Sequence, residues 1–336
     1  MKENEIIENI RKKTGIPGIV ELLTERLSGS EFNSLLLEVF SKKLSGLSPA
    51  MLLKQYQVNR FVHPAETDMV GVLAFELRAL EFLREHRWSP IELSPAAQLG
   101  SCCVVTPGDQ KKIISATRNT EILADATNAI ALHIADQKKS GKTGGAGSVE
   151  AGGRGSNGAV GSADGVKGTL RFCTVHRHIR TQELKSKHHT AHFKIGCLVS
   201  SGLDVGSCGF ESVNLGEHIF TLYHLFRDRF GVEKIWFRLW ERGGYGSRQL
   251  LMERVTEHLE KSMGDIRVIR EAAPGDNNYY KGIQFKMMIE VNGKEMEMAD
   301  GGMVDWTQQL LGNRKERLLI SGFGLEMMYK LRHGMI

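Results

Sequence analysis

The sequence contains few of the features that mark specialised protein classes. No run approaches 18 consecutive apolar residues, so we expect no membrane-spanning helix. The first thirty residues are charged and lack the apolar core of a signal peptide. The five cysteines form an odd count without framework spacing, which favours reduced thiols in a cytoplasmic protein over a disulfide scaffold. What remains is an ordinary globular composition, with 41% hydrophobic and 25% charged residues.

The chain also lacks a strong charge imbalance. Its net charge is +5, but residues 138–168 hold five Lys or Arg against two Asp or Glu, which leaves only +2 for the rest. Net charge therefore gives no indication of nucleic acid binding. The same segment holds 11 of the 37 glycines and no aromatic residue. This composition cannot build a core, and it predicts a flexible insertion.

Helical periodicity is clearest before this segment. We interpret residues 1–62 as a helical N-terminal region and residues 63–336 as the main domain. Ser30 is the expected N-cap of the third N-terminal helix, and Thr120 that of a later Ala-rich helix. The expected helices are Glu3–Lys13, Gly18–Leu27, Glu31–Leu44, Thr67–Arg87 and Ala124–Asp136. Short strands are expected at 91–94, 101–106 and 112–116.

A basic hairpin is predicted at Thr174–Gly202. An extended run starts at Val175, residues 181–192 are polar, and Phe193–Ser200 is apolar and rich in β-prone residues. Such a hairpin brings several Arg and Lys side chains together on one loop, as an anion or nucleotide site requires. It also holds five of the twelve histidines, but without metal-ligand spacing, so no metal site is expected.

Two later stretches add to this pattern. Residues 275–286 read GDNNYYKGIQFK, and residues 301–332 read GGMVDWTQQLLGNRKERLLISGFGLEMMYKLR. Between them, residues 283–298 alternate apolar and polar around Asn292-Gly293, which predicts a tight hairpin. A strand over Leu318–Gly324 and a helix from Leu325 are expected at the end.

Taken in this order, the three stretches resemble histidyl-tRNA synthetase and its class II relatives. The first hairpin resembles motif 2, FRxERPQ followed by a basic loop and an apolar strand. The tyrosine stretch resembles the histidine-binding YYxGxxFE, and the last stretch resembles GGRYD followed by the motif 3 sequence GLGLER. The resemblance covers roughly residues 60–336. It implies an α/β (α+β) fold with a class II antiparallel sheet flanked by helices.

The resemblance also implies a set of site residues. Those matching the nucleotide or anion site are Arg177, Arg180, Gln182 and Glu326. Those matching the substrate pocket are Tyr279, Tyr280, Gly301, Gly302 and Asp305, joined by Glu121 if the alignment shifts by one residue. The implied cofactors are ATP and Mg.

Several motif residues of the family are replaced. Ile179 stands at the motif 2 Glu, Met327 at the motif 3 Arg that binds the γ-phosphate, and Gly275 at the substrate Arg. Adenylation needs fixed positive charge on the transferring group, and the loss of one such group typically costs about 3–4 kcal/mol of transition-state stabilisation. Ordinary synthetase activity is therefore not expected.

Two functional hypotheses remain open. The first is a paralogue without tRNA-charging activity, a ligand-binding or regulatory subunit comparable to that of ATP phosphoribosyltransferase. It implies a homodimer, a protein partner and a small-molecule ligand such as an amino acid. The second is a divergent ATP-dependent ligase that adenylates an amino acid or similar carboxylic acid. Because no anticodon-binding domain is expected, tRNA is not an expected partner in either case. A globular α/β protein with chance motif matches is the third alternative.

Overall fold

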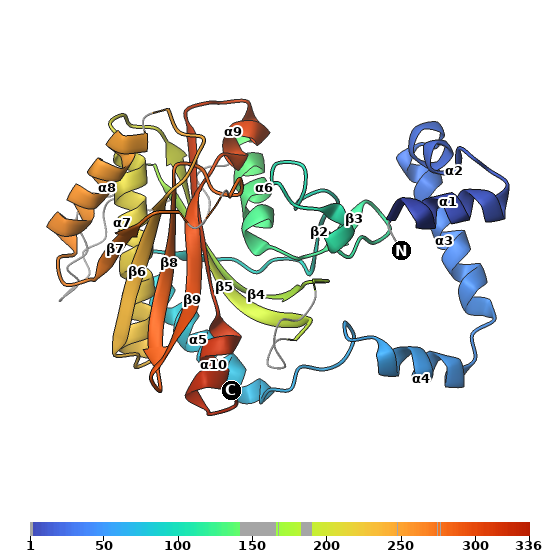
Figure 1. Cartoon of the computed structure of the whole chain (residues 1–336), viewed down its shortest axis with the longest axis horizontal. Helices are drawn as coiled ribbons and strands as arrows, with labels where there is room; N and C mark the ends of the chain where they lie inside the picture. The colour runs from blue at the N-terminus through green and yellow to red at the C-terminus, as the bar shows by residue number, and fades with distance from the viewer. Residues whose placement is uncertain are drawn as a thin grey trace.

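An eight-stranded sheet forms the centre of the molecule (Figure 1). The computed structural model describes residues 3–141, 166, 168–182, 190–246, 248–273, 275 and 277–336. The strands lie in the order β1-β4-β5-β10-β9-β8-β6-β7, antiparallel in the middle, with a parallel pair at each edge. Their bounds are β1 Ser89–Pro90, β4 Leu170–Ile179, β5 His192–Leu203, β6 Lys234–Glu241, β7 Val268–Glu271, β8 Ile283–Val291, β9 Lys294–Val304 and β10 Glu316–Phe323. The α/β fold class expected from the sequence is confirmed.

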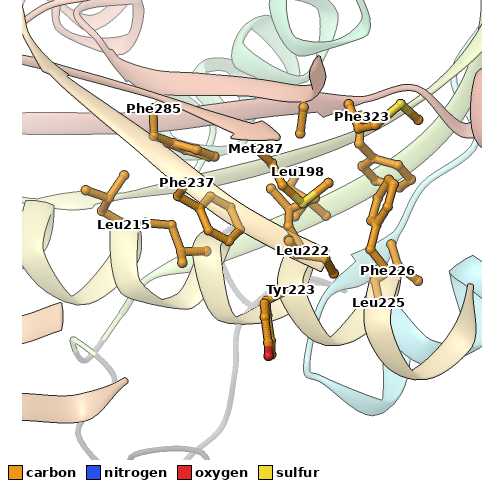
Figure 2. Packing of buried hydrophobic residues seen from close by; sticks show 14 of the residues in the cluster. Leu198, Leu215, Leu222, Tyr223, Leu225, Phe226, Phe237, Phe285, Met287 and Phe323 are labelled. Carbon is orange, nitrogen blue, oxygen red and sulfur yellow. The ribbon is translucent and has the colours of Figure 1, made fainter. Parts of the chain in front are cut away.

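Helices cover both faces of this sheet. The helices of the first face are α5 Met69–Glu85, α7 Gly209–His224 with its π-helical extension η3 Leu225–Arg229, α8 Arg248–Ser262 and α10 Leu325–Arg332. Those of the second face are α6 Ala126–Lys139 and α9 Trp306–Leu311. Strand alternation separates the two cores, because Leu319 and Phe323 of β10 face the first group of helices, whereas Leu318 and Ile320 face the second. Figure 2 shows Leu215 and Leu222 of α7 packed against Phe237 and Phe285.

The two predicted hairpins are confirmed. β4 pairs with β5, and β8 pairs with β9 through a two-residue connection at Asn292 and Gly293. Both connecting residues have positive φ, 53° and 75°, as the hairpin turn favoured by an Asn-Gly pair requires. The odd-numbered residues of β8 from Ile283 to Ile289 are fully buried, as their alternation predicted.

The segment before α6 differs from the prediction. Thr120 and Glu121 belong to a short strand, β3 Thr120–Ile122, which pairs with β2 Ala96–Gln98 in a separate sheet. The N-cap of α6 is Asp125, whose carboxylate accepts a hydrogen bond from the Thr127 amide. An Asp just before an apolar run caps more effectively than a Thr five residues before that Asp, and Thr120 is paired in the sheet.

The strands predicted at 101–106 and 112–116 do not form. Residues 101–106 lie in turns, and residues 112–116 follow the 3₁₀ turn η2 Gln110–Lys112 and meet the β3 segment only through an isolated bridge between Ser115 and Glu121. The first residues of the segment predicted as an insertion at 138–168 belong to α6, which continues to Lys139, and Lys138 forms an ion pair with Glu316. Residues 142–165 and 167 lie outside the described residues.

Helices also form in the N-terminal region. They are α1 Glu3–Thr14, α2 Ile19–Glu21, η1 Leu22–Arg26, α3 Gly29–Ser45 and α4 Pro49–Val58. Ser28, rather than the expected Ser30, caps α3, in a reciprocal capping box with Glu31. Figure 1 shows α1, α2 and α3 near the β2–β3 end of the core, whereas α4 lies apart from it. Within the part of the chain that the structure describes, no helix is both long and apolar enough to cross a membrane.

Candidate binding cavity at the centre of the sheet

A cavity of about 1010 Å³ opens along strands β4, β5, β9 and β10. Its wall carries charges of both signs. The acidic side chains are Asp125, Glu297, Asp300 and Glu326, and the basic ones are Arg180, Lys194 and Lys330. A concave site with converging groups of opposite charge is suited to a small zwitterionic or polar molecule.

Asp125 and Tyr279 form one end of the cavity. The Tyr279 hydroxyl donates a hydrogen bond of 2.7 Å to Asp125 Oδ2, and the amide and hydroxyl of Thr127 donate to Oδ1 at 2.9 and 2.7 Å. Burial by itself raises the pKa of Asp125, but the basic side chains of His178 and Arg180 and these hydrogen bonds lower it below its usual value. The carboxylate is therefore ionised at neutral pH.

His178 lies next to this carboxylate and is almost completely buried. Its Nε2 accepts a hydrogen bond of 3.2 Å from the Ala126 amide, so the neutral ring carries its proton on Nδ1. Burial lowers the pKa of His178 to about 4. Nδ1 has no partner within the described residues, which leaves a buried donor beside the cavity wall.

Asp300 on β9 is a further, partly buried acid of the wall. It accepts a hydrogen bond of 2.7 Å from the Gln284 side-chain amide, and the Oε1 of the same amide accepts one of 2.8 Å from Arg242 Nε. Burial raises the pKa of Asp300 to about 6. This carboxyl group can therefore change its charge close to neutral pH.

Glu326 is surrounded by basic side chains at the opposite end of the cavity. Its carboxylate lies 3.2 Å from Arg177 Nη2 and 3.2 Å from Lys330 Nζ, and it accepts a hydrogen bond of 3.1 Å from the Lys194 amide. The Lys194 ammonium in turn forms an ion pair with Glu76 of α5. Two of the cations along this wall are thus already neutralised by carboxylates of the protein.

Five of the predicted site residues line the cavity. They are Arg180, Gln182, Tyr279, Tyr280 and Glu326. The Arg180 guanidinium lies over the Phe193 ring, 5.4 Å from its centroid, which fixes it at the cavity entrance.

Arg177 and Glu121 do not line it. Arg177 is held by Glu326 and by a hydrogen bond of 3.0 Å to His192. Glu121 is fully buried and accepts hydrogen bonds from the Gly100 and Cys102 amides and from Gln110. Its carboxylate organises the loop at residues 100–110 instead of a ligand.

The GG-x-x-D skeleton has a packing role. A Cβ on Gly301 would lie 2.6 Å from the Phe285 ring, and one on Gly302 would lie 2.5 Å from the Ile283 carbonyl oxygen and 2.7 Å from Tyr280. These glycines let β9 approach its neighbours and the cavity tyrosine closely. Asp305 precedes α9 and accepts a hydrogen bond of 3.0 Å from Gln309, away from the cavity.

Asp125, His178 and Asp300 are among the cavity residues that the sequence analysis missed. Strand alternation could have identified His178, since it points to the same face of β4 as Arg180. For Asp125, the signal was its position directly before a helix. In the described residues, no three His, Cys, Asp or Glu side chains are grouped as a metal site.

No protein-family description matches this sequence, and no curated protein sequence does. Solved structures are similar in fold. Histidyl-tRNA synthetase from S. aureus superposes with a TM-score of 0.58 at 11% identity, covering 82% of this chain and 70% of the other. An ATP phosphoribosyltransferase regulatory subunit/histidyl-tRNA synthetase from Bacillus halodurans gives 0.56 at 13%, covering 81% and 82%. A histidine–tRNA ligase subunit from Alicyclobacillus acidocaldarius gives 0.55 at 13%, covering 82% and 96%. The chain therefore has the fold of a class II aminoacyl-tRNA synthetase core.

Proposed function

We propose that this protein binds an amino acid or a similar small molecule in the central cavity, without charging tRNA, as a ligand-binding or regulatory subunit. The observation that carries the proposal is the pairing of Arg177 with the buried Glu326, next to Met327. In the resembled motifs, the positions of Arg177 and Met327 bind nucleotide phosphates. Here Arg177 is paired with a carboxylate of the protein, and Met327 is apolar.

The remaining polar groups suit a zwitterion. An ammonium group fits against the ionised Asp125, where the Tyr279 hydroxyl already donates a hydrogen bond. A carboxylate fits against Arg180, which is close enough to Asp125 to affect its pKa. The unpartnered Nδ1–H of His178 adds a donor beside the same region. Such a pair of opposite charges selects molecules that carry both an amine and an acid.

The residues present do not fit a triphosphate in this arrangement. Lys194 and Lys330 are each paired with a carboxylate, and Arg180 is the remaining basic side chain along the described wall. A nucleotide would have to displace these pairs, and unpairing a buried carboxylate costs about 3–5 kcal/mol. We therefore derive no reaction step through ATP or Mg.

The alternative function is a divergent ATP-dependent ligase, and Lys330 favours it. This residue lies one helical turn after Met327 on α10 and lines the cavity. If a ligand displaced Glu326 from Lys330, the ammonium would supply a positive charge near the position of the missing Arg.

Calorimetric titration tests the proposal, with each amino acid added in the absence and in the presence of Mg-ATP. A pyrophosphate-exchange assay over the same amino acids accompanies it. We expect one or a few amino acids to bind with no need for ATP and no exchange. Amino-acid-dependent exchange would establish the ligase instead. Binding of neither ligand by the folded protein would show that the cavity is not an amino acid site.

A further inference from the structure

Two carboxylates and two tyrosines form a continuous row along one wall of the cavity. The Tyr279 hydroxyl donates a hydrogen bond of 2.7 Å to Asp125, and the Tyr280 side chain is hydrogen-bonded to Asp300. The two tyrosine rings pack edge to face, with their centroids 4.9 Å apart. All four residues line the cavity. The wall therefore carries an acidic group at each end of an aromatic surface.

Asp300 is presented to the cavity by the sheet itself. It is paired with Lys286 of β8 on one side and with Gly322 of β10 on the other. Directly opposed residues on neighbouring strands face the same side of a sheet. Because Gly322 has no side chain, β10 contributes no charged or bulky group at the position beside Asp300. The carboxylate, which is only partly buried, therefore stays accessible from the cavity.

Asp300 has no counter-ion of its own within the described residues. Lys286 is its neighbour on β8, but the Lys286 ammonium lies 2.6 Å from a carboxylate oxygen of Glu297. Burial raises the pKa of Asp300 to about 6, and the Glu297 charge acts in the same direction. Lys286 and the hydrogen bonds from Gln284 and Tyr280 offset only part of this effect. A cation in the cavity would therefore meet a carboxylate that the protein leaves unpaired.

The other end of the row already has groups for the backbone of an amino acid. In the proposed function, Asp125 receives the ammonium group and Arg180 the carboxylate. The buried and unpartnered Nδ1 of His178 lies beside the same region. With these groups assigned to the backbone of the ligand, Asp300 is left for the ligand's side chain.

We infer that the ligand is a basic amino acid, whose side chain ends in an amine or a guanidinium group that pairs with Asp300. This inference rests on the proposed function. The methylene groups of such a side chain pack on the rings of Tyr279 and Tyr280, and its charge is stabilised near an aromatic face. A neutral side chain leaves Asp300 unpaired. An imidazole is mostly uncharged at pH 7.5 and does so as well.

Calorimetric titration with matched pairs of amino acids tests the inference at pH 7.5. Lysine is compared with norleucine, which lacks only the side-chain amine, and arginine with citrulline, which has nearly the same shape without the charge. We expect the charged member of at least one pair to bind at least tenfold more tightly than its neutral partner, and more tightly than histidine.

The variant Asp300→Asn links this preference to one carboxylate. It should reduce the preference for lysine over norleucine, or for arginine over citrulline, to less than threefold. Glu295→Gln is the matched control, because Glu295 is an acid of the same strand that pairs with Arg238 and does not line the cavity. It should keep the full preference. Circular dichroism confirms that both variants are folded.

The pH dependence gives a second readout. The charged ligand prefers the ionised form of Asp300, so its binding should weaken about fourfold between pH 7.5 and 5.5, as this carboxyl group takes up a proton. The neutral partner should not show this change. His178, whose pKa is lowered to about 4, stays neutral over the same range. The Asp300→Asn variant should lose the pH dependence that separates the two ligands.

The possible failures are distinguishable. If norleucine and citrulline bind as tightly as lysine and arginine, or if histidine binds most tightly, the inference is overturned and the proposed function stands. A full preference in Asp300→Asn would overturn it in the same way. If the folded protein binds no amino acid, the proposed function is overturned together with the inference.

Discussion

Asp125 has two roles at the scale of a single residue. It caps the first turn of α6 and it receives the Tyr279 hydroxyl inside the cavity. The two roles can be separated by substitution, because Asn caps a helix about as well as Asp but carries no charge.

We predict that Asp125→Asn leaves stability within about 1 kcal/mol and weakens amino acid binding at least tenfold, since the lost ion pair with the ammonium group is worth more than about 1.4 kcal/mol. Calorimetry measures the affinity, and urea unfolding measures the stability. The matched control is Asp68→Asn, the same change at the N-cap of α5, away from the cavity. Unchanged affinity in Asp125→Asn would mean that this carboxylate does not contact the ligand.

His218 makes stability depend on pH. It is fully buried on α7, and its ring nitrogens lie 2.8 Å from the Ser321 hydroxyl and 3.0 Å from the Ser200 hydroxyl. Burial, together with the nearby Arg171, lowers the pKa of His218 well below its usual value. Below about pH 6.5 the unfolded chain takes up a proton at this residue and the folded chain does not. The free energy of unfolding therefore decreases as the pH is lowered.

We predict that His218→Gln reduces, by about 1 kcal/mol, the loss of stability that the wild type shows when the pH is lowered from 7.5 to 5.5. The measurement is the free energy of unfolding in urea at both pH values. His178 acts with the same sign, because its pKa is lowered to about 4. Asp300 acts with the opposite sign, because its pKa is raised to about 6. Comparing the variant with the wild type cancels both effects, and an identical pH dependence would contradict the assignment to His218.

At the scale of elements, the cavity depends on how closely β9 approaches its neighbours. Gly302 faces the Ile283 carbonyl oxygen and the Tyr280 ring at distances that leave no space for a methyl group. A Cβ on Gly322, on the adjacent β10, would lie 3.5 Å from its nearest side-chain atom, which is ordinary van der Waals contact.

We predict that Gly302→Ala destabilises the protein by about 1–3 kcal/mol and weakens ligand binding, because the added methyl displaces Tyr280 from the cavity wall. Gly322→Ala is the control and should change stability by less than about 1 kcal/mol. Thermal unfolding and calorimetry give the two quantities. Equal effects of the two substitutions would show that the strand spacing tolerates a side chain at Gly302.

At the scale of the whole molecule, the buried side chains and the N-terminal arm, residues 3–62, are separate in sequence. The buried residues of the described chain begin at Val72 and continue into α10. Stability of a domain follows from the apolar area it buries, so the arm should contribute little to the folding of a single copy.

We predict that deleting residues 3–62 leaves cooperative thermal unfolding, because the buried core lies outside the arm. The deletion also removes Arg60 and the first contact of the hairpin, so ligand affinity should fall as well. If the truncated chain unfolded without cooperativity, the arm would be part of the folding unit.

The sequence by itself determined most of the regular elements. Alternation around Asn292 and Gly293 specifies a hairpin locally, because each side chain faces the side that the two-residue period assigns to it. The same holds for β4 and β5. Motif resemblance predicted Arg180, Tyr279 and Glu326 as site residues, and all three line the cavity.

Tertiary structure alone decided which polar groups remain available to a ligand. Arg177 and Glu326 are separated by almost 150 residues in sequence, and their pairing depends on β4 and α10 meeting at one wall. Glu121 was predicted at the substrate pocket, but its carboxylate accepts hydrogen bonds from amides of a loop whose path no local pattern encodes. Burial and pairing of a charge are set by residues far away in the sequence, because the free energy of a charge depends on everything that surrounds it in space.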